Sequence, residues 1–320
     1  MKKIMNFTTS HFDLDRYKDN ADLKDMYRKH GLDGIELMQS GEDDKEIVSI
    51  DDVIGVHLKY FHYWTPVWNN DTAAMLAEYD SLENCEMVFG GIGREGLISA
   101  HTKNIDFAKN QSPEYAVFHV ADINLQESIT RNYSSTDKEV IDAVIELVNE
   151  VLPPQNADFT LLFENLWWPG LTMKDPEMKE HLFDKVNYKN CGIMLDIGHL
   201  LHTNTSIRSL EEGIDYIYSV LSNYENLDFV KGIHLHQTLS GQYVEEILKN
   251  PIELEGDFKE RYLQTSRHIM NIDYHKPFLS KRIKELVSYI DPRYLVFEFI
   301  SSTREEHESY LMEQTACFCT

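Results

Sequence analysis

The sequence predicts an α/β fold, a single (β/α)8 barrel in which eight parallel strands alternate with helices. Short apolar runs bounded by Gly, Pro, Asp or Asn recur eight times along the 320 residues. Amphipathic stretches separate most of these runs, and this alternation is typical of a parallel sheet covered by helices. No glycine-rich phosphate fingerprint follows the first run, which disfavours the competing open, doubly wound sheet.

In the amino-terminal half, four apolar runs predict four strands, and one helical pattern lies between the first and the second strand. The run KIMNFTT predicts the first strand, and the helical stretch NADLKDMYRKHG ends with Gly31 where a C-terminal cap belongs. Three further strands follow as DGIELM, DVIGVHLKYF and EYAVFHVAD. These five elements cover residues 3–9, 20–31, 33–38, 52–61 and 114–122.

In the carboxyl-terminal half, helices and strands alternate more regularly. The helical patterns DKEVIDAVIELVNEVL, SLEEGIDYIYSVLSNY and LSKRIKELVSYI repeat apolar residues at helical spacing. The strands are DFTLLFENL, CGIMLDIGH, FVKGIHLHQ and RYLVFEFIS. In chain order these elements cover residues 137–152, 158–166, 191–199, 209–224, 229–237, 279–290 and 293–301.

Two connections are too long for one helix each. They cover residues 61–113 and 237–293, after the third and seventh strands. Both begin just past the carboxyl end of a strand, so we expect both to overhang the face where barrel active sites lie. No linker rich in Pro, Gly or Ser interrupts the chain, and residues 1–320 are predicted to form a single domain.

The charge balance limits the classes of partner. Thirty basic and 54 acidic residues give a net charge of −24, and the pI is about 4.9. Such a field repels phosphate backbones and disfavours nucleic acid. No apolar run is long enough to span a membrane, and the first residues lack the apolar stretch of a signal peptide. Four cysteines do not make a disulfide framework, which favours a reducing cytoplasm. Exposed aromatic loops make a homodimer plausible.

Nearly every predicted strand ends on a residue that can bind a metal or carry a proton. A single such residue is usually an ordinary turn or cap residue, but a ring of buried carboxylates is costly without a cation. A divalent metal at the barrel mouth would remove this cost. The strand-end residues are Glu36, His57, His119, Glu164, Asp196, His234, His236 and Glu298.

The donor types indicate which ion would fit. Glu164, Asp196, one histidine at 234 or 236, and Glu298 form an oxygen-rich set with one imidazole. This set suits Mn²⁺, Co²⁺, Mg²⁺ or Zn²⁺ and disfavours a closed thiolate zinc site.

The same motifs resemble the xylose-isomerase-like barrel superfamily. They are Glu164 in FEN, Asp196 and His199 in LDIGH, His236 in HLHQ and Glu298 in FEF. That superfamily includes sugar isomerases, ketose 3-epimerases, inosose dehydratases and endonuclease IV. The resemblance implies that Glu164, Asp196, His236 and Glu298 hold one metal, that the two glutamates exchange the substrate proton, and that His199 contacts substrate. His236 is chosen over His234 because it ends the strand.

The endonuclease branch of this superfamily carries further metal ligands. His119 and His199 each match one of these additional ligands, and Asp273 and His275 in DYH resemble an Asp-x-His pair of ligands in that branch. A loop turn leading into Pro277 would also explain the presence of Asp273 and His275. The endonuclease branch has one more histidine ligand on the loop after the third strand, and His57 lies earlier in the chain than that position. The number of bound metals is therefore left open between one, two and three, and His234 is a further candidate ligand. The loops HYWTPVWNNDTAAML and ENLWWPGLTMKD carry almost no basic residues, which disfavours a DNA-cleaving enzyme.

All four tryptophans follow two of these strand ends. Trp64 and Trp68 follow the third strand, and Trp167 and Trp168 follow Glu164. Aromatic faces pack against sugar rings and exclude water, so we expect at least one of each pair to line a substrate pocket, together with Glu36.

The predicted function is a metal-dependent isomerase or epimerase of carbohydrate metabolism. Its substrate would be a sugar or related polyol, with a neutral one favoured and a phosphorylated one left open, and an ene-diolate would form between two proton transfers by Glu164 and Glu298. Dehydration is a related outcome. The alternatives are an endonuclease IV-like metal-dependent phosphodiesterase and a catalytically silent sugar-binding barrel.

Overall fold

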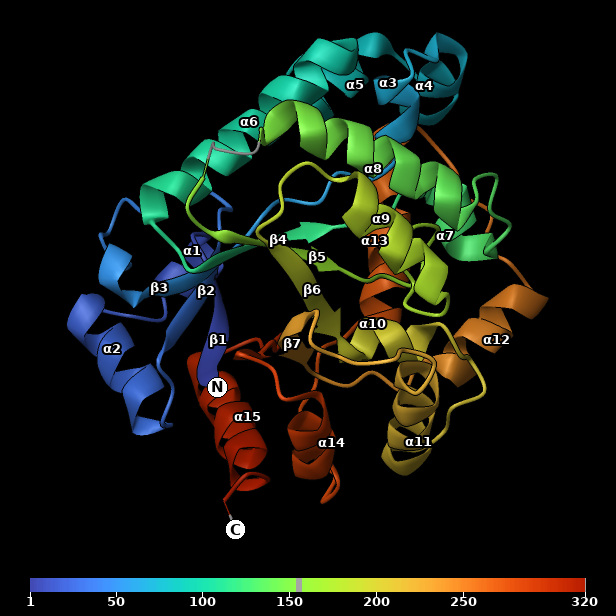
Figure 1. Cartoon of the computed structure of the whole chain (residues 1–320). Helices are drawn as coiled ribbons and strands as arrows, with labels where there is room; N and C mark the ends of the chain where they lie inside the picture. Colours follow the sequence, from blue (N-terminus) through green and yellow to red (C-terminus); the bar gives the residue numbers. More distant parts are fainter. Residues whose placement is uncertain (154–156, 320) are drawn as a thin grey trace.

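Eight parallel strands close into a barrel in the order β1 to β8, which confirms the predicted fold class (Figure 1). The computed structural model describes residues 1–153 and 157–319. Every predicted strand is present. The strands are β1 (Lys2–Thr8), β2 (Gly34–Met38), β3 (Val53–His57), β4 (Tyr115–His119), β5 (Thr160–Glu164), β6 (Cys191–Asp196), β7 (Val230–Leu235) and β8 (Tyr294–Phe297).

Helices surround the barrel, and the four clearest helical patterns correspond to α2, α8, α11 and α14. The described helices are α1 (His11–Leu14), α2 (Asn20–Lys29), α3 (Thr65–Trp68), α4 (Thr72–Tyr79), α5 (Leu82–Phe89), α6 (Gly93–Gln111), α7 (Leu125–Thr130), α8 (Asp137–Val151), α9 (Pro176–Lys185), α10 (Ile197–His202), α11 (Leu210–Leu221), α12 (Gly241–Lys249), α13 (Phe258–Ile272), α14 (Ile283–Ile290) and α15 (Arg304–Ala316), with a 3₁₀ turn at Ile50–Asp52. None of them, within the described chain, is long and apolar enough to cross a membrane.

Local sequence fixes where several helices begin. The hydroxyl of Thr136 accepts a hydrogen bond from the amide of Glu139, and the Glu139 carboxylate accepts one from the Thr136 amide. Ser209 and Asp257 start α11 and α13 with the same reciprocal capping. Each cap satisfies backbone groups that a helix start otherwise leaves unpaired.

The two long connections form the helical insertions α3–α6, between β3 and β4, and α12–α14, between β7 and β8. They contact each other. The Phe258 amide at the start of α13 donates to the Asp80 carboxylate at 2.5 Å, and Arg261 donates to the Glu78 carbonyl at 2.6 Å. Because both insertions leave the carboxyl ends of strands, their contact lies on the face of the barrel that carries the strand-end residues.

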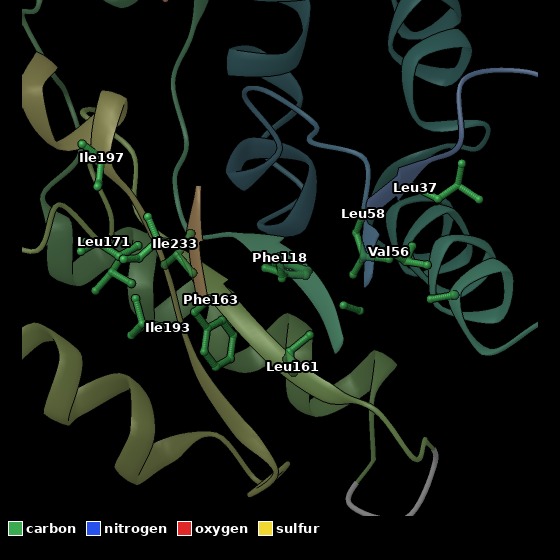
Figure 2. Close-up of a cluster of buried hydrophobic side chains, with 14 of the residues drawn as sticks. Leu37, Val56, Leu58, Phe118, Leu161, Phe163, Leu171, Ile193, Ile197 and Ile233 are labelled. Atoms are coloured by element: carbon green, nitrogen blue, oxygen red, sulfur yellow. The ribbon is translucent and has the colours of Figure 1, made fainter. Parts of the chain in front are cut away.

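Alternate residues of each strand face outward toward the helices and inward toward the barrel axis. The outward residues form the main apolar core, which includes Leu37, Val56, Leu161, Phe163 and Ile233 (Figure 2). A separate apolar cluster lines the interior, with Ile4, Tyr115, Val117, Leu162, Met194, Tyr294 and Val296.

The interior changes from apolar to polar toward the carboxyl ends of the strands. On β4, β5 and β6 the inward residue two positions beyond the apolar cluster is His119, Glu164 or Asp196. The parity that buries Val117, Leu162 and Met194 therefore also directs these polar side chains into the barrel mouth.

Gly55 makes room for this polar layer. An added Cβ there would lie 2.1 Å from Cζ of Tyr115, so only glycine lets that ring cross the interior. The Tyr115 hydroxyl then donates to Oε2 of Glu36 at 2.7 Å.

Candidate metal centre

Among the described residues, four groups of imidazoles and carboxylates lie in the barrel mouth, and in each the donor atoms lie within 4.8 Å of one another. We call three of them donor groups 1, 2 and 3, and the fourth consists of Glu36, His57 and His234. Every residue predicted to bind metal belongs to one of them. Group 1 is His57, His119 and Glu164; group 2 is Glu164, Asp196, His234 and Glu298; group 3 is His199, His236, Asp273 and His275.

Donor group 2 has the spacing of ligands around one ion. Nδ1 of His234 lies 2.9 Å from Oε1 of Glu164, 3.4 Å from Oε2 of Glu298 and 3.7 Å from Oδ2 of Asp196. Two ligands about 2.1 Å from a tetrahedral ion are about 3.4 Å apart. Oε2 of Glu298 is buried without a hydrogen-bond partner among the described residues. The arrangement therefore fits a divalent cation.

The histidine of donor group 2 is His234, whereas His236, the ligand favoured by the sequence, belongs to donor group 3. β7 ends at Leu235, so His234 is its last inward residue and His236 follows beyond the strand. Nε2 of His236 lies 2.9 Å from Asp196 but 3.9 Å from Glu298, and its ring packs on Gly198. His234 and His236 are two residues apart and would face the same side of a continuous strand. They differ because β7 ends between them, at Leu235.

Donor group 1 lies on the other oxygen of Glu164. Nε2 of His57 and of His119 lie 3.2 Å and 3.1 Å from Oε2 of Glu164, and this oxygen has no hydrogen-bond partner among the described residues. Burial lowers the pKa of His119 to about 3, although the Glu164 charge opposes the shift. A neutral imidazole facing an unpartnered carboxylate oxygen is the form that binds metal.

Donor group 3 is built on a strained loop beyond α13. Oδ2 of Asp273 lies 2.9 Å from Nε2 of His275 and 3.2 Å from Nε2 of His199. His275 has a left-handed φ of 44°, a costly conformation for a side chain other than glycine. The rings of His236 and His275 stack with their centroids 3.7 Å apart. The turn that leads into Pro277 thus places Asp273 and His275 beside His199 and His236.

Further residues hold these donors in place. Nε2 of His234 lies 3.0 Å from Oε1 of Glu36, which leaves Nδ1 facing donor group 2. A register shift between β2 and β3 occurs at Ile35 and Glu36, where it helps to direct this carboxylate inward. Glu36, which was expected to line a substrate pocket, is 1% exposed and contacts His234 and Tyr115. A carboxylate that orients a histidine in this way is typical of metal sites.

The charges of the cluster are strongly coupled. Burial raises the pKa of Glu164, but the neighbouring imidazoles of His119 and His234, the second of which also forms a hydrogen bond with it, outweigh burial and hold the pKa well below its usual range. Burial lowers the pKa of His234, yet Glu36, Glu298 and Glu164 raise it well above its ordinary value. Without a cation, protons on the histidines compensate the carboxylates. Metal ions would replace those protons.

The four tryptophans differ in their relation to the donors. The Trp167 ring lies 5.1 Å from that of His199, and Trp168 packs on Trp167 at 4.5 Å. Trp64 instead donates to the Ala121 carbonyl, and Trp68 donates to Glu146 on α8. The Trp167 and Trp168 pair borders the donor groups, whereas Trp64 and Trp68 secure the first insertion.

An opening of about 300 Å³ reaches the donors between the loops after β1 and β8. Glu298 and His275 line it, and so does Arg16, which sequence reasoning missed. Arg16 donates to the carbonyl of Ser301 at 2.6 Å and pairs with Asp13 at 3.3 Å. Its place soon after the first strand was the available signal. The hydroxyls of Thr8, Ser10, Ser40 and Ser301 complete the polar lining.

His202 is a second residue that sequence reasoning missed. Its Nε2 lies 3.4 Å from Oδ1 of Asp273, and its Nδ1 lies 3.1 Å from the Ser240 hydroxyl. It therefore supports Asp273 from behind. The signal was its position on the short helix that Asp196 starts, where Asp196 accepts from the His199 amide at 2.6 Å.

Comparison with known proteins gives a likeness in fold. No family model matches the sequence, and no curated protein matches it. Endonuclease IV from Thermus thermophilus is similar in structure with a TM-score of 0.53, 13% identity, and coverage of 99% of both chains. The probable 3-DHS dehydratase AsbF from Bacillus anthracis is similar with a TM-score of 0.50, 10% identity, and coverage of 100% of this chain and 99% of its own. The predicted resemblance is confirmed at the level of the fold.

Proposed function

We propose that the chain is a hydrolase of phosphate esters that uses two or three divalent metal ions. The observation that carries this proposal is the contact between three donor groups, two of which share Glu164. An isomerase with one metal needs donor group 2 alone. A one-metal isomerase would not need His57 and His119 to face the second oxygen of Glu164. It would also not need Asp273 to lie within reach of both His199 and His275.

The residues divide the work between holding ions and placing the substrate. Groups 1, 2 and 3 would hold the ions, which when bound supply Lewis-acid activation and a water of lowered pKa. Glu36 and His202 fix the orientation of His234 and Asp273. Trp167 covers His199 and excludes bulk water from that side. Arg16 and the hydroxyls near Glu298 would orient the part of the ester that reaches the opening.

The surroundings favour a small substrate over a nucleic acid. The net charge of −24 opposes the phosphate contacts that supply most of the affinity for DNA. Asp196, His234 and His236 are fully buried, so a polymer backbone could not reach them without movement of the insertions. The opening of about 300 Å³ suits a small ester.

A second candidate is the sugar isomerase or epimerase expected from the sequence. The observation that favours it is the convergence of Glu164 and Glu298 on Nδ1 of His234, at 2.9 and 3.4 Å. Two carboxylates placed in this way could exchange a proton through an ene-diolate. The hydroxyl-lined opening also suits a neutral polyol. A silent sugar-binding barrel would need neither the second nor the third donor group.

Hydrolysis and isomerisation can be tested on the same preparation. Protein loaded with Zn²⁺ or Mn²⁺ is assayed with p-nitrophenyl and bis-p-nitrophenyl phosphate, and separately with ketoses in deuterated water. We expect p-nitrophenol release from at least one of the two esters, and this release should fall at least 100-fold in Asp273→Asn. Asp122→Asn is the matched control, because Asp122 is a buried carboxylate that bonds Trp64 and Thr65 instead of the donors. Deuterium incorporation without ester cleavage would contradict the hydrolase and support the isomerase.

A further inference from the structure

An apolar groove of about 520 Å³ lies where the two insertions meet. Its walls come from the loop after β3, from α5 and from the start of α13. The lining residues are Tyr60, Phe61, His62, Met87, Val88, Phe258, Lys259, Tyr262 and Leu263. Lys259 is the one lysine or arginine among them.

The apolar side chains of the groove are unusually open to solvent. Met87, Tyr262 and Leu263 are 56%, 43% and 54% exposed. Leaving three large apolar side chains exposed in one concave surface forgoes the stabilisation that burial would give. Concave apolar surfaces with a few polar groups are typical of small-molecule sites.

One ring connects the groove to donor group 1. Tyr60 lines the groove, and its ring centroid lies 5.1 Å from that of His119 and 6.0 Å from that of Trp168. A ligand in the groove would therefore be separated from the donors by a single aromatic side chain. This continuity relates the groove to the same substrate that the metal centre would bind.

Two buried polar atoms along the groove have no partner among the described residues. They are the hydroxyl of Tyr60 and Nε2 of His62. Burial lowers the pKa of His62 to about 4, so its imidazole is neutral at neutral pH. The His62 ring also lies 5.3 Å from that of Tyr262. Unpaired buried polar groups are costly, and a ligand with matching polar atoms would satisfy them.

We infer that the groove binds a flat aromatic group on the organic part of the ester substrate. The inference rests on the proposed function and names its substrate class, an aryl-bearing phosphate ester. The aromatic group stacks among Tyr60, Phe61 and Tyr262, and a polar atom on it pairs with His62 or the Tyr60 hydroxyl. The phosphate points from the groove toward donor group 1, which Tyr60 borders through its contact with His119.

Two phosphonates that cannot be hydrolysed test this inference by calorimetry on the zinc-loaded protein. Naphthylmethylphosphonate carries an aromatic group, and methylphosphonate does not. We expect the naphthyl compound to bind at least ten-fold more tightly. Tyr262→Ala and Met87→Asp should reduce this preference below three-fold. Their matched controls, Tyr289→Ala on α14 and Met312→Asp on α15, change side chains that are 49% and 59% exposed elsewhere and should preserve it.

The outcomes separate the groove from the metal centre. Equal binding of the two phosphonates would contradict the inference that the groove binds an aromatic group, but it would not contradict the proposed function. A preference that survives Tyr262→Ala would also overturn the inference. Absence of binding by both compounds would contradict the proposed function itself. Sedimentation velocity tests a second copy of the chain as the occupant: a dimer that dissociates in Tyr262→Ala would assign the groove to self-association and overturn the inference.

Discussion

Removing the carboxylate of Glu36 tests whether His234 is a metal ligand. Glu36 lies 3.0 and 3.2 Å from Nε2 of His234 through its two oxygens, and both side chains are buried. In Glu36→Ala this nitrogen loses its partner, so neither the ring orientation nor the proton on Nε2 is held. Groups that orient a metal-bound histidine typically contribute about 10–100-fold in affinity, or about 1.4–2.7 kcal/mol.

Two variants give graded expectations. We expect Glu36→Ala to weaken Zn²⁺ binding about 100-fold, and Glu36→Gln, which keeps a hydrogen-bond acceptor but removes the charge, to weaken it about 10-fold. Affinity is measured by competition with a metal-sensitive dye. Asp122→Asn should bind Zn²⁺ like the unmodified chain, because Asp122 bonds Trp64 and Thr65. An affinity for Glu36→Ala within three-fold of the unmodified chain would refute the role of Glu36.

Three further predictions concern protons, acid stability and packing. Burial lowers the pKa of His275, but Asp273 and Glu298 outweigh burial and raise this pKa to about 9. Metal binding at pH 7.5 should therefore release protons. A calorimetric binding enthalpy that does not depend on the buffer would contradict this prediction. Hydrogen bonds from Arg304 lower the pKa of Asp22 from 3.8 to about 2. Above pH 4, the free energy of unfolding should therefore be about 0.5 kcal/mol higher for the unmodified chain than for Asp22→Asn, because the Asp22–Arg304 pair is partly exposed. This difference should disappear as the pH falls toward 2 and Asp22 becomes protonated. Urea unfolding at pH 6 and pH 2.5 measures it, and an equal difference at both pH values would contradict the reasoning. Gly55→Ala should lower the free energy of unfolding by about 1–3 kcal/mol, since the new Cβ collides with Tyr115; an unchanged urea midpoint would contradict the packing argument.

The fold and most of the donors followed from periodicity in the sequence. A parallel barrel brings the carboxyl ends of all strands to one face, so His57, His119, Glu164 and Asp196 had to lie near one another once the strands were recognised. This holds because the inward parity of each strand is set by its apolar residues, such as Leu162 before Glu164.

Details beyond the strand ends could not be obtained in this way. The choice between His234 and His236 depends on β7 ending at Leu235, and strand ends are not encoded in residue parity. Asp273 and His275 lie 37 residues or more beyond His236 along the chain, and only the path of α13 returns them to the donors. The side chain of Arg16 likewise reaches the opening through a contact with Ser301, far away in sequence.

The aromatic residues show a second limit of sequence reasoning. Trp64 and Trp167 both follow a strand at the same face, yet Trp64 donates to the Ala121 carbonyl while Trp167 packs beside His199. Which partner each ring finds depends on how the insertion α3–α6 folds back. Composition and spacing do not determine this.

The number of metal ions per chain tests the central claim most directly. Elemental mass spectrometry is applied to gently purified protein and to Asp273→Asn after dialysis against zinc and removal of free metal. We expect two to three equivalents of zinc in the unmodified chain and a loss of about one equivalent in Asp273→Asn, because Asp273 gathers His199 and His275 into donor group 3. A single equivalent that Asp273→Asn leaves unchanged would contradict it.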